Sequence, residues 1–153
     1  MLKPLLWTAA VAAAFTNAAC TSGQENPSVG TSAWQLTTIG GQPVLRYSAA
    51  FSHLPAPFLV IRQDGTGPIA LHGFGGCNTF SGTIDARQPT AESSVEATEQ
   101  HCGEDIAVQE MTLFRILSNY PRFDFSRSAE TIRITSKDGT RLTGSRTSVL
   151  AVP

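Results

Sequence analysis

Short apolar runs separated by turn residues characterise the chain from residue 33 onwards. Trp34–Ile39 is such a run and ends at two glycines. A second run, Phe58–Ile61, leads to a turn at Asp64-Gly65, after which Ile69–Phe74 is apolar again. Short runs rich in aliphatic and aromatic residues, bounded by Asp-Gly or Gly-Gly, are typical of strands joined by tight turns. The first half of the chain therefore predicts antiparallel hairpins.

The same pattern returns near the C-terminus. Thr131–Thr135 alternates polar and apolar residues, which places Ile132 and Ile134 on one face of a strand. A turn at Asp138-Gly139 then leads into Arg141–Thr143. Because Asp-Gly favours the tight turns that join two paired strands, we expect a second hairpin here.

One segment, Ile106–Tyr120, has helical rather than strand periodicity. Its apolar residues recur every three or four positions, which gives a helix one apolar face. We expect that face to point into the core, with Ala107, Met111, Phe114 and Leu117, widened by Leu113, Ile116 and Tyr120. Glu104 and Asp105 would supply negative charge and a capping oxygen at the helix N-terminus, and Pro121 would end the helix. Together these elements predict an α+β fold in which one helix covers a curved antiparallel sheet.

The first nineteen residues predict an export signal. The amino group of Met1 and the side chain of Lys3 carry positive charge, and Leu5–Phe15 is apolar apart from Thr8. This stretch of eleven residues is too short to span a bilayer and has the length of a signal-peptide core. We expect residues 1–19 to be removed on export.

The end of this leader resembles a lipoprotein processing site, because Ala18 and Ala19 precede Cys20 as small residues precede a lipidated cysteine. Lipidation of Cys20 would account for one of the three cysteines and leave an even pair. In a bacterium with two membranes, Thr21 after the cysteine favours the outer membrane, with the protein facing the periplasm. The alternative is a cut after Ala18, which would release a soluble periplasmic or secreted protein.

Residues 20–32 are polar and lack apolar periodicity, so we expect a flexible tether. Residues 33–153 have the size of one domain with its own core, and we expect a monomer. Without the leader the chain carries 10 basic and 12 acidic side chains, a formal charge of −2. This balance argues against nucleic acid as a partner. Acids concentrate in residues 85–110 and bases in residues 115–146, so either surface could dock a charged partner.

Glycines cluster around one cysteine, in the segment Gly73–Gly82. Glycine permits positive φ and close approach of backbones, as a sharp bend between strands requires. We expect Asn78 to satisfy backbone groups of this bend and Phe80 to enter the core. The structural motif comprises Gly75, Gly76, Asn78, Phe80, Ser81 and Gly82.

We expect Cys77 and Cys102 to form a disulfide, since export favours oxidation of cysteine pairs. The bond would close a loop of about 25 residues and stabilise the fold by about 3 to 4 kcal/mol in chain-entropy estimates. A metal site on the two cysteines with His72 and His101 is the alternative, but the C-x-x-C spacing of many zinc sites is missing. We expect no metal and no cofactor.

Catalytic motifs are not evident in the sequence. The segment Gly73–Asn78 ends in Asn where a dinucleotide-binding loop needs Gly, and Ser81 does not lie in a G-x-S-x-G turn. The three histidines, His53, His72 and His101, have no recognisable triad partners. We therefore expect no enzymatic activity.

Several of these segments together resemble the META domain, or HslJ-like, family. The most specific is Gly75–Gly82, in which Gly-Cys-Asn is followed by Phe-Ser-Gly. The others are Trp34-Gln35-Leu36, Gly41-Gln42-Pro43-Val44, Thr98 four residues before Cys102, and Gln109-Glu110 at the opening of an apolar helix. The resemblance covers residues 33–146.

This resemblance implies a small α+β domain built from a strongly bent antiparallel sheet, like an open barrel, with one covering helix. It also implies an exported and lipid-anchored protein without an established enzymatic activity, linked to heat-inducible stress and antibiotic tolerance at the cell envelope. Such links describe when a protein is used and supply no mechanism.

The leading functional hypothesis is a non-catalytic envelope module, held at the membrane by its lipid anchor, that binds a protein or a small ligand. Exposed loops such as Ser48–Pro57 would carry the binding surface. One alternative is an inhibitor of lysozyme, in which the acidic stretch Glu92–Glu104 would face the basic enzyme. The other alternative is an envelope hydrolase.

Overall fold

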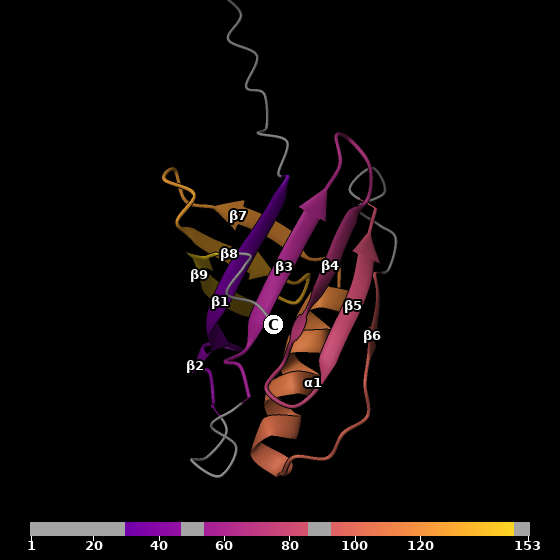
Figure 1. Cartoon of the computed structure of the whole chain (residues 1–153), viewed down its shortest axis with the longest axis vertical. Helices are drawn as coiled ribbons and strands as arrows, with labels where there is room; N and C mark the ends of the chain where they lie inside the picture. The colour runs from indigo at the N-terminus through magenta and orange to yellow at the C-terminus, as the bar shows by residue number, and fades with distance from the viewer. Residues whose placement is uncertain (1–29, 47–53, 86–92, 149–153) are drawn as a thin grey trace, which may run out of the picture.

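The computed structural model describes residues 30–46, 54–85 and 93–148. The leader, Cys20, nearly all of the expected tether and the first part of the Ser48–Pro57 loop lie outside the described residues. Within the described part, nine strands form one antiparallel sheet and a single helix packs against it (Figure 1). The α+β fold predicted from the sequence is thereby confirmed. No helix in these ranges is long and apolar enough to cross a membrane.

The first strand begins two residues before the expected start of the domain. The elements in chain order are β1 Thr31–Ile39, β2 Gln42–Pro43, β3 Phe58–Gln63, β4 Ile69–Phe74, β5 Thr79–Ile84, β6 Ser94–Ala97, α1 Glu104–Ser118, β7 Arg122–Phe125, β8 Thr131–Thr135 and β9 Arg141–Thr147. The strands lie in the order β6-β5-β4-β3-β1-β9-β8-β7, and the short β2 pairs with β1.

Both hairpins predicted from Asp-Gly turns are present. β3 pairs with β4 around Asp64-Gly65, and β8 pairs with β9 around Asp138-Gly139. In the second turn the Ser136 hydroxyl and the Thr140 backbone N–H donate hydrogen bonds to the Asp138 carboxylate, and these bonds lower the pKa of Asp138 to about 2. The turn is therefore held by an ionised carboxylate at neutral pH.

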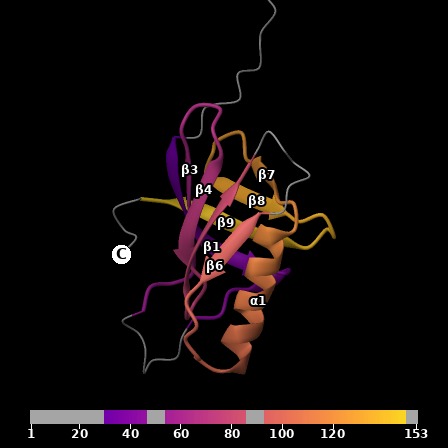
Figure 2. The same cartoon turned by 90° about the vertical axis from the view of Figure 1, so that its right-hand side faces the viewer.

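A bulge in β1 accounts for part of the bend in the sheet. β1 lies at the centre, since it pairs with β3 on one side and β9 on the other. Its register against β9 shifts between Leu36 and Thr38, which leaves Thr37 as an extra residue. The hydroxyls of Thr37 and Thr38 both hydrogen-bond to the hydroxyl of Thr143. A bulge increases the local twist of a strand, and the sheet curls around α1, which contacts β6, β1, β8 and β9 (Figure 2).

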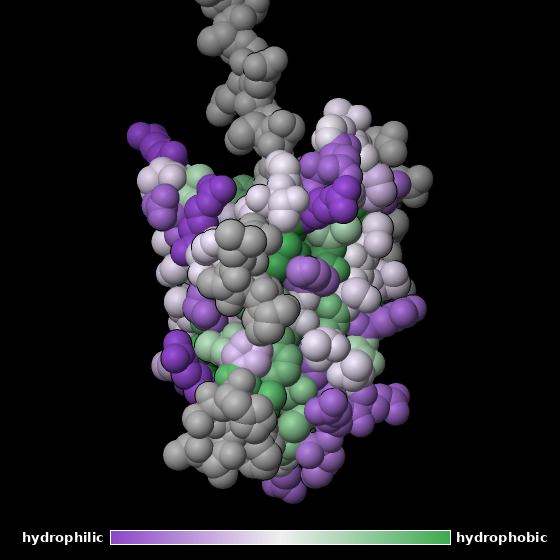
Figure 3. Space-filling view, viewed as in Figure 1, coloured by the Kyte–Doolittle hydropathy of each residue, from purple (hydrophilic) through white to green (hydrophobic). Residues whose placement is uncertain are grey.

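The main core lies between α1 and the concave face of the sheet. Its fully buried side chains are Trp34, Leu36, Leu59, Ile61, Leu113, Ile116, Leu117, Ile132, Ile134 and Leu142. A second, smaller cluster on the opposite face comprises Ala33, Phe58, Val60 and Phe74. In Figure 3 hydrophobic atoms gather over β3 and β4 on this face. The sheet is thus apolar on both sides near its centre.

The helix differs from the predicted one in its ends and in its buried face. It spans Glu104–Ser118, so it begins and ends two residues earlier than expected. Met111 is 66% exposed, whereas Gln109 and Glu110 are buried. The buried face of the helix is therefore rotated from the purely apolar face toward these two polar residues. The expected capping side chain was also wrong, because the N-cap residue is Gly103 and no side chain caps the helix.

Gly73 in β4 should tolerate no side chain. An added Cβ would overlap the carbonyl oxygen of Phe58 and lie 2.6 Å from the ring of Phe80. Gly73→Ala should therefore lower the free energy of unfolding by about 3 kcal/mol, as overpacking of a core does. Gly30→Ala is the control, since no atom lies within 4 Å of its added Cβ, and it should change stability by less than about 0.5 kcal/mol. Urea denaturation measures both, and equal effects would contradict the packing argument.

Candidate functional site

The glycine-rich segment forms the connection between β4 and β5, as expected. The backbone N–H of Gly75 donates a hydrogen bond of 2.9 Å to the carbonyl of Asn78, which closes a tight turn. Gly76 has a φ of 123°, a conformation that favours glycine. We call residues 75–78 the corner. All four of its residues are buried.

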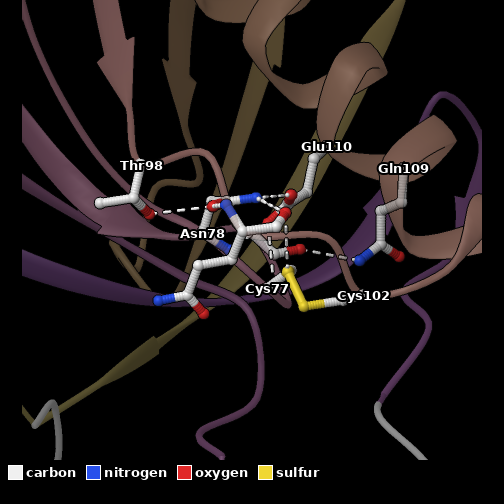
Figure 4. The surroundings of a disulfide bond; sticks show 8 residues. Cys77, Asn78, Thr98, Cys102, Gln109 and Glu110 are labelled. Carbon is white, nitrogen blue, oxygen red and sulfur yellow. Dashed lines mark hydrogen bonds between the residues drawn. A yellow bond between two sulfur atoms is a disulfide. The ribbon is translucent and has the colours of Figure 1, made fainter.

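The carboxylate of Glu110 attaches the corner to α1 (Figure 4). Its Oε1 accepts hydrogen bonds from the backbone N–H groups of Cys77, at 2.9 Å, and Asn78, at 2.6 Å. Its Oε2 accepts a third from Nδ2 of Asn78, at 2.7 Å. Glu110 only accepts in these bonds, which is the pattern of an ionised carboxylate, and charge-assisted bonds of this kind are stronger than neutral ones. A single side chain of the helix thereby satisfies three donors of the corner.

The side chain of Asn78 extends this network to the segment after β6. Its Oδ1 accepts hydrogen bonds from the hydroxyl of Thr98, at 2.9 Å, and from the backbone N–H of Gln100, at 2.6 Å. Its Nδ2 donates to the carbonyl of Gln100, at 3.1 Å, as well as to Glu110. The expectation that Asn78 satisfies backbone groups is confirmed, and all four hydrogen-bonding positions of its amide are used.

Gln109 links the corner to the segment after β2, on the other side of the helix. Its Nε2 donates to the carbonyl of Gly75, at 2.9 Å, and its Oε1 accepts from the backbone N–H of Leu45, at 2.6 Å. The two corner glycines make room for these side chains. An added Cβ would lie 2.6 Å from Oε1 of Glu110 at Gly75, and 3.1 Å from Nε2 of Gln109 at Gly76.

A disulfide joins Cys77 of the corner to Cys102, which lies just before α1. The two Cα atoms are 5.9 Å apart and 25 residues apart in sequence. The bond predicted from the cysteine count is present, and it fixes the start of the helix to the corner. The cysteines of the alternative metal site are thus bonded to each other. In the described ranges no three His, Cys, Asp or Glu side chains are grouped so as to hold a metal ion.

Of the remaining motif residues, Phe80 and Gly82 occupy closely packed positions and Ser81 is exposed. Phe80 is buried and its ring meets that of Phe114 edge-on, with centroids 5.6 Å apart. At Gly82 an added Cβ would lie 2.6 Å from the carbonyl oxygen of Ser94, so β5 and β6 approach closely there. Ser81 is exposed, and the structure assigns it no part in the corner.

Reasoning from periodicity missed Gln109 and Glu110, although they carry most of the site. One signal could have found them: both lie three or four residues from Ile106 and Leu113, two residues of the buried face. A polar residue at such a position faces the core, and a buried polar group needs hydrogen-bond partners.

Of the surface hollows beside α1, two lie on opposite sides of the helix. The larger, of about 720 Å³, lies between α1 and the segment around β2, and we call it the groove. Leu45, which is 44% exposed, and Val108, which is 58% exposed, line it, and Asp105 and Arg115 lie at its margins. The smaller, of about 200 Å³, opens beside the disulfide, and we call it the disulfide cavity. The corner thus lies between two concave surfaces.

Comparisons with known proteins agree with this fold. The model of the META domain family matches residues 27–149. A solved structure, described as the NMR structure of the protein from Burkholderia xenovorans, is similar with a TM-score of 0.54 and 19% sequence identity. The alignment covers 96% of this chain and 99% of that chain, and at this identity it shows a shared fold. No curated protein matches the chain.

Removal of the Glu110 carboxylate should strongly destabilise the fold. Glu110→Ala leaves three buried donors of Cys77 and Asn78 without an acceptor, and we expect a loss of about 3 to 5 kcal/mol in the free energy of unfolding. Glu104→Ala removes an exposed carboxylate from the first turn of the same helix, where negative charge is mildly favourable, and should lower it by less than about 1 kcal/mol. Chemical denaturation compares the two variants, and a Glu110→Ala variant as stable as Glu104→Ala would refute the anchoring role.

The two cysteines should behave as one unit. Cys77→Ser and Cys102→Ser should each lower stability by about 3 kcal/mol, and the double variant should be no less stable than either single variant. Reduction of the native protein should produce a similar loss. Clear additivity of the two substitutions in denaturation experiments would show that the cysteines act separately.

Proposed function

The chain belongs to the META domain family, and on this premise we propose that it is a cell-envelope module that acts by binding a segment of another protein, without catalysis. The leader and Cys20 would place it at the outer membrane as a lipoprotein, on a tether with a span of roughly 20 Å. We further propose that its binding role is exercised under envelope stress, as the family resemblance implies.

The buried polar side chains around the corner are all engaged in hydrogen bonds within the fold. The side chains of Asn78, Gln109 and Glu110 bond to the corner and to neighbouring backbone. Within the part of the chain that the structure describes, Ser93 Oγ is the only buried side-chain nitrogen or oxygen without a hydrogen-bond partner. This supports a structural role for the corner and directs the search for a binding surface to the exterior.

The observation that carries the proposal is the groove between α1 and β2. Leu45 and Val108 expose apolar side chains on its walls, and neither residue belongs to the hydrophobic core clusters. Gln109 holds the Leu45 wall in place through the backbone of that residue. Contiguous apolar surface with a polar margin is typical of protein interaction sites.

The charges at the margins of the groove suggest what it binds. Asp105 and Arg115 are ten positions apart on α1, which corresponds to about 15 Å along the helix axis. An extended peptide covers that distance in about five residues. A partner segment with a basic residue at one end, an acidic residue at the other and an apolar side chain between them would complement the groove.

A photo-crosslinking amino acid tests this proposal. Placed at position 108 in the lipidated protein, it should form one discrete adduct with another envelope protein, and the adduct should be lost when Leu45 is replaced by Ser. The same amino acid at exposed position 133, on β8, is the matched control and should form no such adduct. The proposal fails if position 108 gives no adduct, if both positions give the same adducts, or if Leu45→Ser leaves the adduct unchanged.

A further inference from the structure

The disulfide cavity lies on the opposite side of α1 from the groove. Four helix residues spaced by three or four positions line it, namely Ala107, Glu110, Met111 and Phe114. Cys77, Asn78, Gln100 and Cys102 complete its walls. The groove uses other positions of the helix, 105, 108, 109, 112 and 115, so the two hollows share no residue.

The charge of Glu110 is incompletely matched in this cavity. Its Oε1 accepts two hydrogen bonds and its Oε2 accepts one, whereas a carboxylate offers about four acceptor positions. One position on Oε2 is therefore unused. No Lys or Arg among the described residues forms an ion pair with Glu110, although buried carboxylates are usually paired with a cation. The side chain is 4% exposed, so bulk water contributes little to its solvation.

The other walls of the cavity fit an apolar group beside a cation. Ala107, Met111, Phe114 and the disulfide present carbon and sulfur atoms. An aromatic ring attracts a nearby cation through its electron-rich face, and the thioether of methionine adapts to different ligand shapes. The carbonyl oxygen of Gln100 accepts a hydrogen bond from Asn78 and lies 3.3 Å from Sγ of Cys77. Because that sulfur is in a disulfide and has no proton to donate, the carbonyl keeps a second acceptor position. The volume of about 200 Å³ equals that of about seven water molecules in the liquid.

We propose that the disulfide cavity binds a primary ammonium group carried by a small apolar body, as in an alkylamine or arylalkylamine. The ammonium donates hydrogen bonds to Oε2 of Glu110 and to the carbonyl of Gln100, and its third N–H remains in water. The apolar body lies against Met111 and Phe114. This site is separate from the groove, so it stands or falls independently of the protein partner proposed above.

Benzylammonium and benzyl alcohol test the proposal with the full mature chain, because they differ in charge and hardly in size. Titration followed by backbone amide NMR should show binding of benzylammonium, with the largest shifts at residues 107, 111 and 114. Benzyl alcohol should bind at least tenfold more weakly. Equal affinity for the two probes would show that the carboxylate does not recognise the ligand, and no binding of benzylammonium would refute the site.

Two helix variants locate the site without removing Glu110, whose loss should strongly destabilise the fold. Ala107→Leu fills the cavity and should weaken benzylammonium binding at least tenfold. Val108→Trp adds a similar volume at an exposed position on the groove side of the helix and should leave the affinity unchanged. A thermal melt of each variant confirms that both remain folded. Equal losses in the two variants, or unchanged binding in Ala107→Leu, would overturn the assignment.

Discussion

The hydrogen bonds between Glu110 and the corner are the interaction on which the rest of the structure depends. A chain that turns sharply between two buried strands leaves N–H groups that water cannot reach, and each such group costs free energy unless it has an acceptor. One carboxylate on α1 meets three of these donors, at Cys77 and Asn78. Because the acceptor comes from the helix, the corner is satisfied only when the helix lies against the sheet. The stability of the turn therefore depends on the packing of the helix.

The other stabilising features act around that contact. Gln109, the residue before Glu110 in the helix, connects the corner to the chain after β2. The disulfide fixes Cys102, two residues before the start of the helix, to the corner. The bulge at Thr37 increases the twist of β1, the central strand of the sheet. Together they hold a curled sheet around one helix. The polar network faces inward, and the groove and the disulfide cavity lie on the surface on opposite sides of α1.

Local signals in the sequence predicted the features that depend on neighbouring residues. The alternation around Ile132 and the Asp-Gly turns gave both hairpins, and the cysteine count gave the disulfide. Features that depend on distant residues were not predictable in this way. The bulge at Thr37 exists only in relation to β9. Met111 is apolar yet exposed. Glu110 is charged yet buried, because the corner, which is distant in sequence, supplies its hydrogen-bond donors.

A double-mutant cycle between Glu110 and Asn78 tests the central claim most directly. The free energy of unfolding is measured for the native chain, Glu110→Ala, Asn78→Ala and the double variant. If the carboxylate and the amide act as one network, the second substitution should have much less effect once the first is present, with a coupling energy of about 2 kcal/mol. Additive effects within about 0.5 kcal/mol would contradict the account, since they would show that the helix and the corner are stabilised independently.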